Sequence, residues 1–235
     1  MHVDTPPFDN NDVRLALKYA VDRDELIDKI LNGTGSAGND HPISPTNNYY
    51  HSELPQRAYD PDKAKFHLKK AGMENLTVKL STSEGIWEGA VDAATLYSES
   101  AAKAGINIEI NKVPNDGYWS DVWLKHSWCA SWWSGRPTED WMFTSGYAAG
   151  GSWNETRWAH PRFNELLKAA RGELDEAKRT EMYWTMQEMI SREAGTIIPA
   201  YMANVDGMAS NVNGLKPSPL GGLMGFAFAE HVWLS

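Results

Sequence analysis

The stretch LTVKLSTSEGIWEGAVDAATLYSESAAKAGINIEINKV, residues 76 to 113, decides the fold class of this chain. Residues 76 to 82 alternate as a β-strand, and residues 88 to 104 are rich in alanine with an apolar helical face that ends at Gly105. A second alternating segment, INIEINKV, follows at 106 to 113. This order of strand, helix and strand predicts a right-handed crossover and a largely parallel sheet flanked by helices, in the α/β class.

The next segments continue the same pattern. Residues 118 to 125, YWSDVWLK, form a candidate short helix, and residues 127 to 133, SWCASWW, form a candidate third strand. In open α/β sheets, ligands bind beyond the carboxyl ends of the strands. The loop SGRPTED, residues 134 to 140, follows the third strand and therefore lies where a binding site is expected.

The sequence before residue 76 is read as helices and a loop. The apolar periodicity of residues 12 to 31 predicts one long helix or two helices joined at Asp22. Residues 33 to 56 contain many glycine, proline, asparagine and serine residues, which predicts a long surface loop. Asp60 is an expected helix N-cap, and Gly72 is expected to end that helix.

The C-terminal part predicts two helices and two short strands. The helices are expected at residues 160 to 174 and 175 to 195, with Gly195 as the C-cap of the second. Short strands are expected at TIIPAYM, residues 196 to 202, and VDGMA, residues 205 to 209.

Composition excludes several classes of protein. The 235 residues are 42% hydrophobic and 23% charged, which is the balance of a globular protein. The net charge is −9, from 22 Lys and Arg against 31 Asp and Glu, so a nucleic-acid-binding surface is not expected. No apolar run reaches the roughly 18 residues of a membrane-spanning helix. The opening residues also lack the apolar core of a secretory signal, so we expect either a cytoplasmic protein or a piece of a longer one.

Motifs for catalysis, metals and cofactors are missing from the sequence. Neither a phosphate-binding loop nor a dinucleotide-binding glycine motif occurs, and the 7 histidines do not show metal-ligand spacing. Glu139 and Asp140 are neighbours whose side chains diverge, so they cannot flank one glycosidic bond. Cys129 lies in the candidate third strand and is expected to be an inert buried thiol. We therefore expect no catalytic residue, no metal and no cofactor.

Tryptophan is concentrated in the middle of the chain. Of 11 tryptophans, eight lie between residues 119 and 158. Packing alone seldom needs so many large rings in one part of a domain, whereas ligand sites use rigid aromatic walls with a few polar groups. At least two of these rings are therefore expected to line a binding site, and Trp132 and Trp133 must point to opposite faces if they lie on a strand.

Five segments together resemble the large C-terminal lobe of the family 5 extracellular solute-binding proteins, the dipeptide, oligopeptide and nickel binding proteins of ABC importers. They occur in the order of that family and are distributed from residue 6 to residue 201. The segments are PPFDNNDVRLALKYAVDRDELIDKILNGTG (6–35), AYDPDKAKFHLKKAG (58–72), SWWSGRPTEDWMF (131–143), WNETRWAHPRFNELLKAAR (153–171) and RTEMYWTMQEMISREAGTIIPAY (179–201).

The resemblance implies a fold, a domain division and a function. The fold would be a periplasmic-binding-protein-like lobe, with residues 8–210 forming the ligand-binding lobe and residues 211–235 crossing to a first lobe that this chain lacks. The intact protein would be the substrate-binding component of an ABC importer, periplasmic or extracellular and membrane-associated through its transporter. Its partners would be a small peptide-like or carboxylated solute and the ABC permease.

The resemblance also singles out Arg136. Peptide binders of the family carry an aspartate in the corresponding loop, in a pattern like G-D-x-x-D-P, which holds the amino terminus of the ligand. Arg136 occupies that position here, and its guanidinium suits a carboxylate or phosphate instead. The alternative is a surface ion pair of Arg136 with Glu139 or Asp140. Either Thr138 or Asp140 is expected to cap a helix that begins at Trp141.

The remaining candidate ligand-binding residues are aromatic or polar neighbours of that loop. Two of them, Tyr118 and Trp119, follow strand 106–113, and for these two the alternative to ligand contact is packing between helix and sheet. The candidates are Tyr118, Trp119, Trp132, Trp133, Trp153 and Asn154.

Two other classes of function remain possible from the sequence. A tryptophan-rich carbohydrate-active enzyme would turn over its substrate with this chain alone, but the sequence offers no competent nucleophile or metal cluster for it. A free-standing interaction domain would require a gene that begins at this methionine. The solute receptor is the favoured interpretation.

Overall fold

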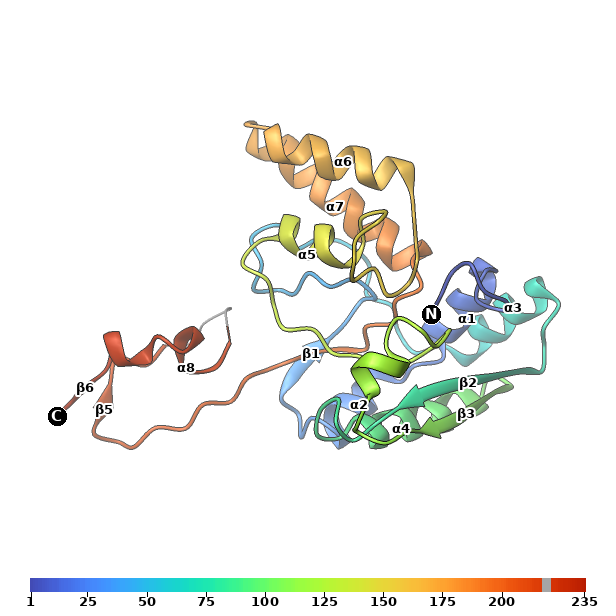
Figure 1. Ribbon diagram of the computed structural model, residues 1–235, viewed down its shortest axis with the longest axis horizontal. Coiled ribbons are helices and arrows are strands. Elements are labelled where there is room, and N and C mark those ends of the chain that lie inside the picture. Colours follow the sequence, from blue (N-terminus) through green and yellow to red (C-terminus); the bar gives the residue numbers. More distant parts are fainter. Residues whose placement is uncertain (217–220) are drawn as a thin grey trace.

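The computed structural model describes residues 1–216 and 221–235, and it consists of two packed groups of elements and an extended C-terminal segment (Figure 1). The helices are α1 (Asn11–Tyr19), α2 (Arg23–Lys29), α3 (Pro61–Ala71), α4 (Ala90–Ala102), the π-helix Tyr118–Val122, α5 (Glu139–Gly146), α6 (Pro161–Gly172), α7 (Glu176–Glu193), the short turn α8 (Gly222–Gly225) and the 3-10 helix Phe228–Glu230. The strands are β1 (Gly35–Ala37), β2 (Leu76–Thr82), β3 (Ile106–Lys112), β4 (Ala200–Met202), β5 (Val212–Asn213) and β6 (Trp233–Leu234).

The first group is built on the predicted strand, helix and strand. β2 and β3 pair in parallel, with Leu76 opposite Ile106, and α4 connects them. Alternate residues of β2, including Val78 and Leu80, are buried against the core that α1, α3 and α4 complete. The α/β fold class and the parallel pairing are confirmed.

The predicted third strand at residues 127–133 is wrong except for one bridge. The amide of Ser81 donates to the carbonyl of Trp128 at 3.1 Å, and the amide of Ala130 donates to the carbonyl of Ser81 at 2.8 Å. Beyond Ala130 the chain leaves the sheet, and the hydroxyl of Ser131 bonds to the side chain of Glu155. Residues 128–130 thus pair with β2, whereas residues 131–133 do not extend the ladder.

The predicted helix boundaries before residue 76 are confirmed. Residues 12–31 form two helices, and Asp22 caps the second by accepting from the amide of Glu25. Asp60 caps α3 in the same way, and Gly72 ends α3 with a φ of 69°, a left-handed conformation that favours glycine.

The prediction of a surface loop at residues 33–56 is wrong in its middle. β1 pairs antiparallel with β4, and Asp40 and His41 are fully buried. The carboxylate of Asp40 accepts two hydrogen bonds of 2.9 Å from Arg23 and one of 2.8 Å from Arg57. Polar composition suggested exposure, but these ion pairs hold the segment inside.

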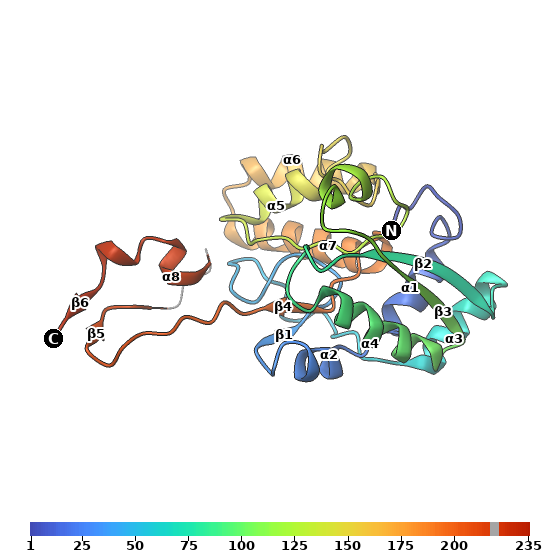
Figure 2. The same cartoon turned by 60° about the horizontal axis from the view of Figure 1, so that its bottom comes forward.

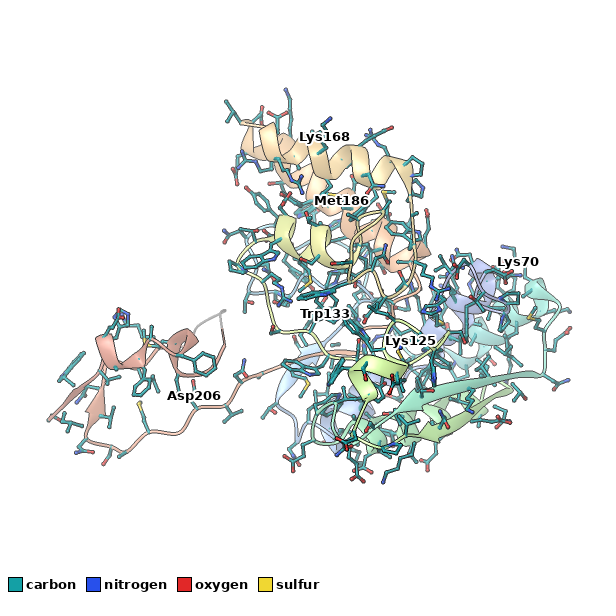
Figure 3. All side chains as sticks on the ribbon, in the orientation of Figure 1. Lys70, Lys125, Trp133, Lys168, Met186 and Asp206 are labelled. Atoms are coloured by element: carbon teal, nitrogen blue, oxygen red, sulfur yellow. The ribbon has the colours of Figure 1, made fainter. Side chains whose placement is uncertain are left out.

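The second group packs α5, α6 and α7 around a separate core. Phe143, Phe163, Met186 and Ile190 are fully buried there, and Met186 is labelled in Figure 3. The two helices predicted at residues 160–174 and 175–195 are therefore present as α6 and α7. The prediction that Gly195 caps this helix is wrong, because the C-cap is Ala194 and the backbone of Met1 leaves no space for a Cβ atom at Gly195.

Cationic side chains join the two groups at the C-terminal end of α7. The Nζ of Lys18 donates to the carbonyls of Ser191 and Ala194 at 2.8 and 2.9 Å, and Arg14 donates to the carbonyl of Glu193 at 2.7 Å. Cations at this end also interact favourably with the helix dipole. Burial lowers the pKa of Lys18 from 10.5 to about 7.

The C-terminal segment leaves both groups after β4 (Figures 1 and 2). β4 confirms part of the strand predicted at 196–202, but residues 205–209 form no strand and their side chains are exposed. The segment ends in a small antiparallel pair of β5 and β6. None of the helices in the described part of the chain is both long enough and apolar enough to span a lipid bilayer.

Candidate functional site

Four tryptophans gather at the junction of the two groups, and we call them the indole platform: Trp119, Trp123, Trp133 and Trp153. Their rings meet edge to face, with centroid separations of 5.7 Å for Trp119 and Trp123, 6.4 Å for Trp123 and Trp153, and 5.9 Å for Trp133 and Trp153. Edge-to-face contacts are favourable for aromatic pairs. Trp119 is 41% exposed and Trp153 45% exposed, so the platform presents large apolar surface to solvent.

Three different segments supply the platform. The π-helix carries Trp119 and ends beside Trp123, Trp133 precedes the loop to α5, and Trp153 lies in the loop between α5 and α6. Figure 3 shows Trp133 between the helical group and the sheet. The ring of Trp133 packs against Gly146, where an added Cβ atom would lie 3.3 Å from it. The fold therefore joins rings that are distant in the sequence.

Arg136 lies on this platform. The guanidinium carbon is 5.4 Å from the ring centroid of Trp133 and 5.9 Å from that of Trp153, distances at which a cation is attracted to an aromatic ring. Its Nη1 donates to the carbonyl and the hydroxyl of Ser134 at 3.0 and 2.8 Å. Within residues 1–216 and 221–235, Nε and Nη2 of Arg136 have no hydrogen-bond partner, so one edge of the guanidinium can receive a carboxylate or phosphate.

The two acids that follow are engaged elsewhere. Glu139 is buried and accepts from the amide of Tyr49 at 3.0 Å, and Asp140 forms an ion pair of 2.7 Å with Arg171. The predicted alternative of a surface pair with Arg136 is therefore not formed. Thr138 caps α5 by accepting from the amide of Trp141, which confirms one of the two predicted caps.

Three other predicted site residues lie outside the platform: one is exposed, and two donate hydrogen bonds to backbone carbonyls. Trp132 is 52% exposed but stacks with no platform ring, consistent with its pointing away from Trp133. Tyr118 is buried, and its hydroxyl donates to the carbonyl of Ala130 at 2.6 Å, so it packs between helix and sheet. The side chain of Asn154 donates to the carbonyl of Trp158 at 2.7 Å and so stabilises its own loop.

Glu155 and Trp123 are site residues that the candidates from the sequence did not include. One carboxylate oxygen accepts from Nε1 of Trp123 at 2.6 Å, and the other accepts from Nε1 of Trp133 at 3.2 Å. The hydroxyl of Ser131 donates to the same carboxylate at 2.9 Å. The only sequence signal was the position of Glu155 two residues after Trp153.

The thiol of Cys129 is not an activated nucleophile. Burial, followed by the negative charge of Glu155, raises the pKa of the Cys129 thiol to about 11, so it stays protonated at neutral pH. A cavity of about 240 Å³ lies beside β2 and has no platform tryptophan in its lining, which consists of Lys79, Ser81, His126, Ser127 and Trp128. In the described part of the chain, no three His, Cys, Asp or Glu residues are grouped to hold a metal ion.

Similar proteins exist in several bacteria. The dipeptide-binding protein of Escherichia coli is 28% identical over 94% of this chain and 43% of its own length. Heme-binding protein A of Haemophilus influenzae is 28% identical over 92% of this chain and 41% of its own length. This chain thus spans less than half of the curated relatives that it matches.

Solved structures show the same fold. HbpA2 from Haemophilus parasuis matches with a TM-score of 0.83 at 22% identity, over 100% of this chain and 47% of that one. DppA from Helicobacter pylori, solved in complex with the peptide STSA, matches with a TM-score of 0.82 at 27% identity, over 100% of this chain and 46% of that one.

The profile of one protein family also matches residues 1–155, which include Arg136, Glu155 and all four rings of the platform. The family is described as bacterial extracellular solute-binding proteins, family 5 Middle. The predicted resemblance is confirmed, and this chain belongs to the family 5 extracellular solute-binding proteins.

Proposed function

We propose that the protein carrying this chain is the substrate-binding component of an ABC importer, which binds a small peptide-like or carboxylated solute without changing it chemically. The relatives support this function over a carbohydrate-active enzyme, because they are named for binding dipeptides or heme. The structure of DppA in complex with the peptide STSA supports a peptide-like ligand. The ligand would rest its apolar part on the indole platform and direct an anionic group to Arg136.

The open edge of Arg136 is the observation that carries this proposal. Nη1 of Arg136 donates to the hydroxyl of Ser134. The guanidinium carbon lies near the rings of Trp133 and Trp153. The remaining edge offers two parallel N–H donors, which is the geometry that a carboxylate accepts. An arginine in this position favours an anionic group, whereas an aspartate would favour an amine.

The two-part organisation remains part of the proposal. Residues 8–210 would form one lobe, and residues 211–235 would cross to another lobe formed by sequence outside this chain. The supporting observation is that the described part of residues 211–235 exposes large apolar side chains, including Phe226, Trp233 and Leu234, which are 81%, 61% and 73% exposed. Such surface is normally covered by a partner.

Location and transport partner follow from the same function. The family is extracellular by description, and a relative in Salmonella typhimurium is named as a periplasmic peptide transport protein. We infer that this protein acts in the periplasm or outside the cell and delivers its solute to a membrane permease.

Native mass spectrometry of the whole receptor, purified from its own host, would identify any retained solute. The role of Arg136 can then be tested with acetyl-Ala-Leu, which has a free carboxylate, and with its C-terminal amide. In the whole receptor, Arg136→Ala should weaken binding of the carboxylate by about 2–5 kcal/mol, because a desolvated charge pair is lost. Titration calorimetry measures the change.

Arg162→Ala is the matched control, because Arg162 is an exposed arginine of α6 that forms an ion pair with Glu165 three residues later in the same helix. It should leave the affinity unchanged. An unchanged affinity of Arg136→Ala for the carboxylate, or an equal loss for the carboxylate and the amide, would reject anion binding by Arg136.

A further inference from the structure

Glu155 occupies the centre of the hydrogen bonds that hold the indole platform. Its two oxygens together accept from Trp123, Trp133 and Ser131, at 2.6, 3.2 and 2.9 Å. Its own amide donates to the carbonyl of Trp153 at 2.8 Å. Glu155 therefore forms hydrogen bonds with three of the four platform residues, two through its carboxylate and one through its backbone amide.

These hydrogen bonds determine what the platform can offer a ligand. An indole has a single N–H donor and no acceptor. Because Glu155 uses that donor in both Trp123 and Trp133, these two rings present only carbon edges and π-faces. The free edge of Arg136 lies against Trp133 and Trp153 and offers charged donors beside these two rings.

The same carboxylate also fixes the direction of the rings. A tryptophan that is free at one edge can change its side-chain rotamer, whereas a ring bonded to an ionised acceptor is held in one orientation, because charge-assisted hydrogen bonds are the strongest of their kind. The bond from Trp123 to Glu155 spans 32 residues and that from Trp133 spans 22 residues. One carboxylate thus aligns rings from separate segments.

We propose that Glu155 is a positioning and specificity-determining residue of the receptor. By holding Trp123 and Trp133 and occupying their N–H donors, it makes the site select a solute whose apolar or planar part lies next to its anionic group. The selection of an apolar neighbour rests on the proposed function, whereas the positioning of the indoles can be tested without any solute.

The first experiment measures the indole N–H groups by NMR in the whole receptor labelled with ¹⁵N. Glu155→Gln keeps the side-chain volume but leaves one amide oxygen where two carboxylate oxygens accepted. The resonances of Trp123 and Trp133, assigned with Trp123→Phe and Trp133→Phe, should shift, and their exchange with water should become faster by on the order of tenfold. Glu74→Gln, at an exposed position, is the control and should leave both unchanged.

The second experiment measures selectivity in the whole receptor. Acetyl-Ala-Leu and acetyl-Ala-Asn have free carboxylates and side chains of similar shape but opposite polarity. Glu155→Gln should reduce the preference for the leucine probe by roughly tenfold, because rings that regain a free N–H can bond to the asparagine side chain. A purely structural role would weaken both probes equally.

The outcomes separate the two proposals. Unchanged indole resonances and exchange in Glu155→Gln would overturn the positioning role, whatever the receptor binds. Altered resonances with an unchanged preference between the probes would overturn the role in specificity. If instead Arg136→Ala has no effect on either probe while the indole resonances respond to Glu155→Gln, the proposed anion site fails and the positioning of the rings stands.

Discussion

Two regions of this chain combine guanidinium groups with a carboxylate, and they differ in their access to water. In the charge cluster of Arg23, Asp40 and Arg57, the side chains are at most 8% exposed, and the carboxylate accepts from both arginines. On the indole platform, Arg136 is partly exposed and, among the described residues, donates hydrogen bonds within its own turn, to Ser134 and Gly135.

The difference separates structural charges from charges that are available to a ligand. A buried charge must be paired and hydrogen-bonded, because removing it from water costs several kcal/mol. The charge cluster meets this requirement within the chain. Arg136 keeps a free edge at an exposed aromatic surface, where a second charge can still arrive. Residue type alone does not distinguish the two arginine environments.

The largest effect should come from opening the charge cluster. Asp40→Ala leaves Arg23 and Arg57 buried without their carboxylate and removes an acceptor for the amide of Ile198. We expect the free energy of unfolding to fall by about 3–5 kcal/mol. Urea unfolding followed by circular dichroism measures the loss, with Asp28→Ala, an exposed acid, as the control. A loss below about 1 kcal/mol would remove the contrast between the two regions.

The pH dependence of stability should reveal the buried Lys18. Desolvation depresses its folded pKa to about 7, so from about pH 7 to its unfolded value of 10.5 the unfolded chain binds more protons than the folded one. Stability should therefore rise with pH in that window, by at most about 1.4 kcal/mol per pH unit, and this gain is absent below pH 7.

Lys18→Met should flatten the slope that urea unfolding records between pH 8 and 9.5. Lys168→Met, on the exposed face of α6, should leave it unchanged. Equal slopes for wild type and Lys18→Met would mean that Lys18 titrates normally in the folded chain.

A smaller effect is expected beside the platform, where the turn that carries Arg136 leads into α5. Thr138→Ala removes the cap on the amide of Trp141, which should cost about 1 kcal/mol. Thr138→Ser keeps a hydroxyl in the same place and should recover most of the stability. Thermal unfolding compares the two, and a serine variant as unstable as the alanine variant would show that the hydroxyl is not the cause.

Local patterns predicted much of the fold correctly. The strand at 76–82, most of the strand predicted at 106–113, the break between helices at Asp22 and the cap Asp60 follow from residues a few positions apart, and the structure contains them, with Thr138 as one of the two caps predicted for α5. The errors depend on distant partners. The polar composition of residues 33–56 could not reveal the buried Asp40, because Arg23 and Arg57 lie 17 residues away on either side.

By itself, the sequence determined the α/β class, the family and the concentration of tryptophan around a turn that carries Arg136. Only the tertiary structure decided which indoles meet, since Trp132 lies outside the platform while Trp123 joins it. The physical reason is that a ring's direction depends on its hydrogen-bond partner. That partner is Glu155, which lies 32 residues from Trp123 and 22 from Trp133 and becomes their neighbour only through folding.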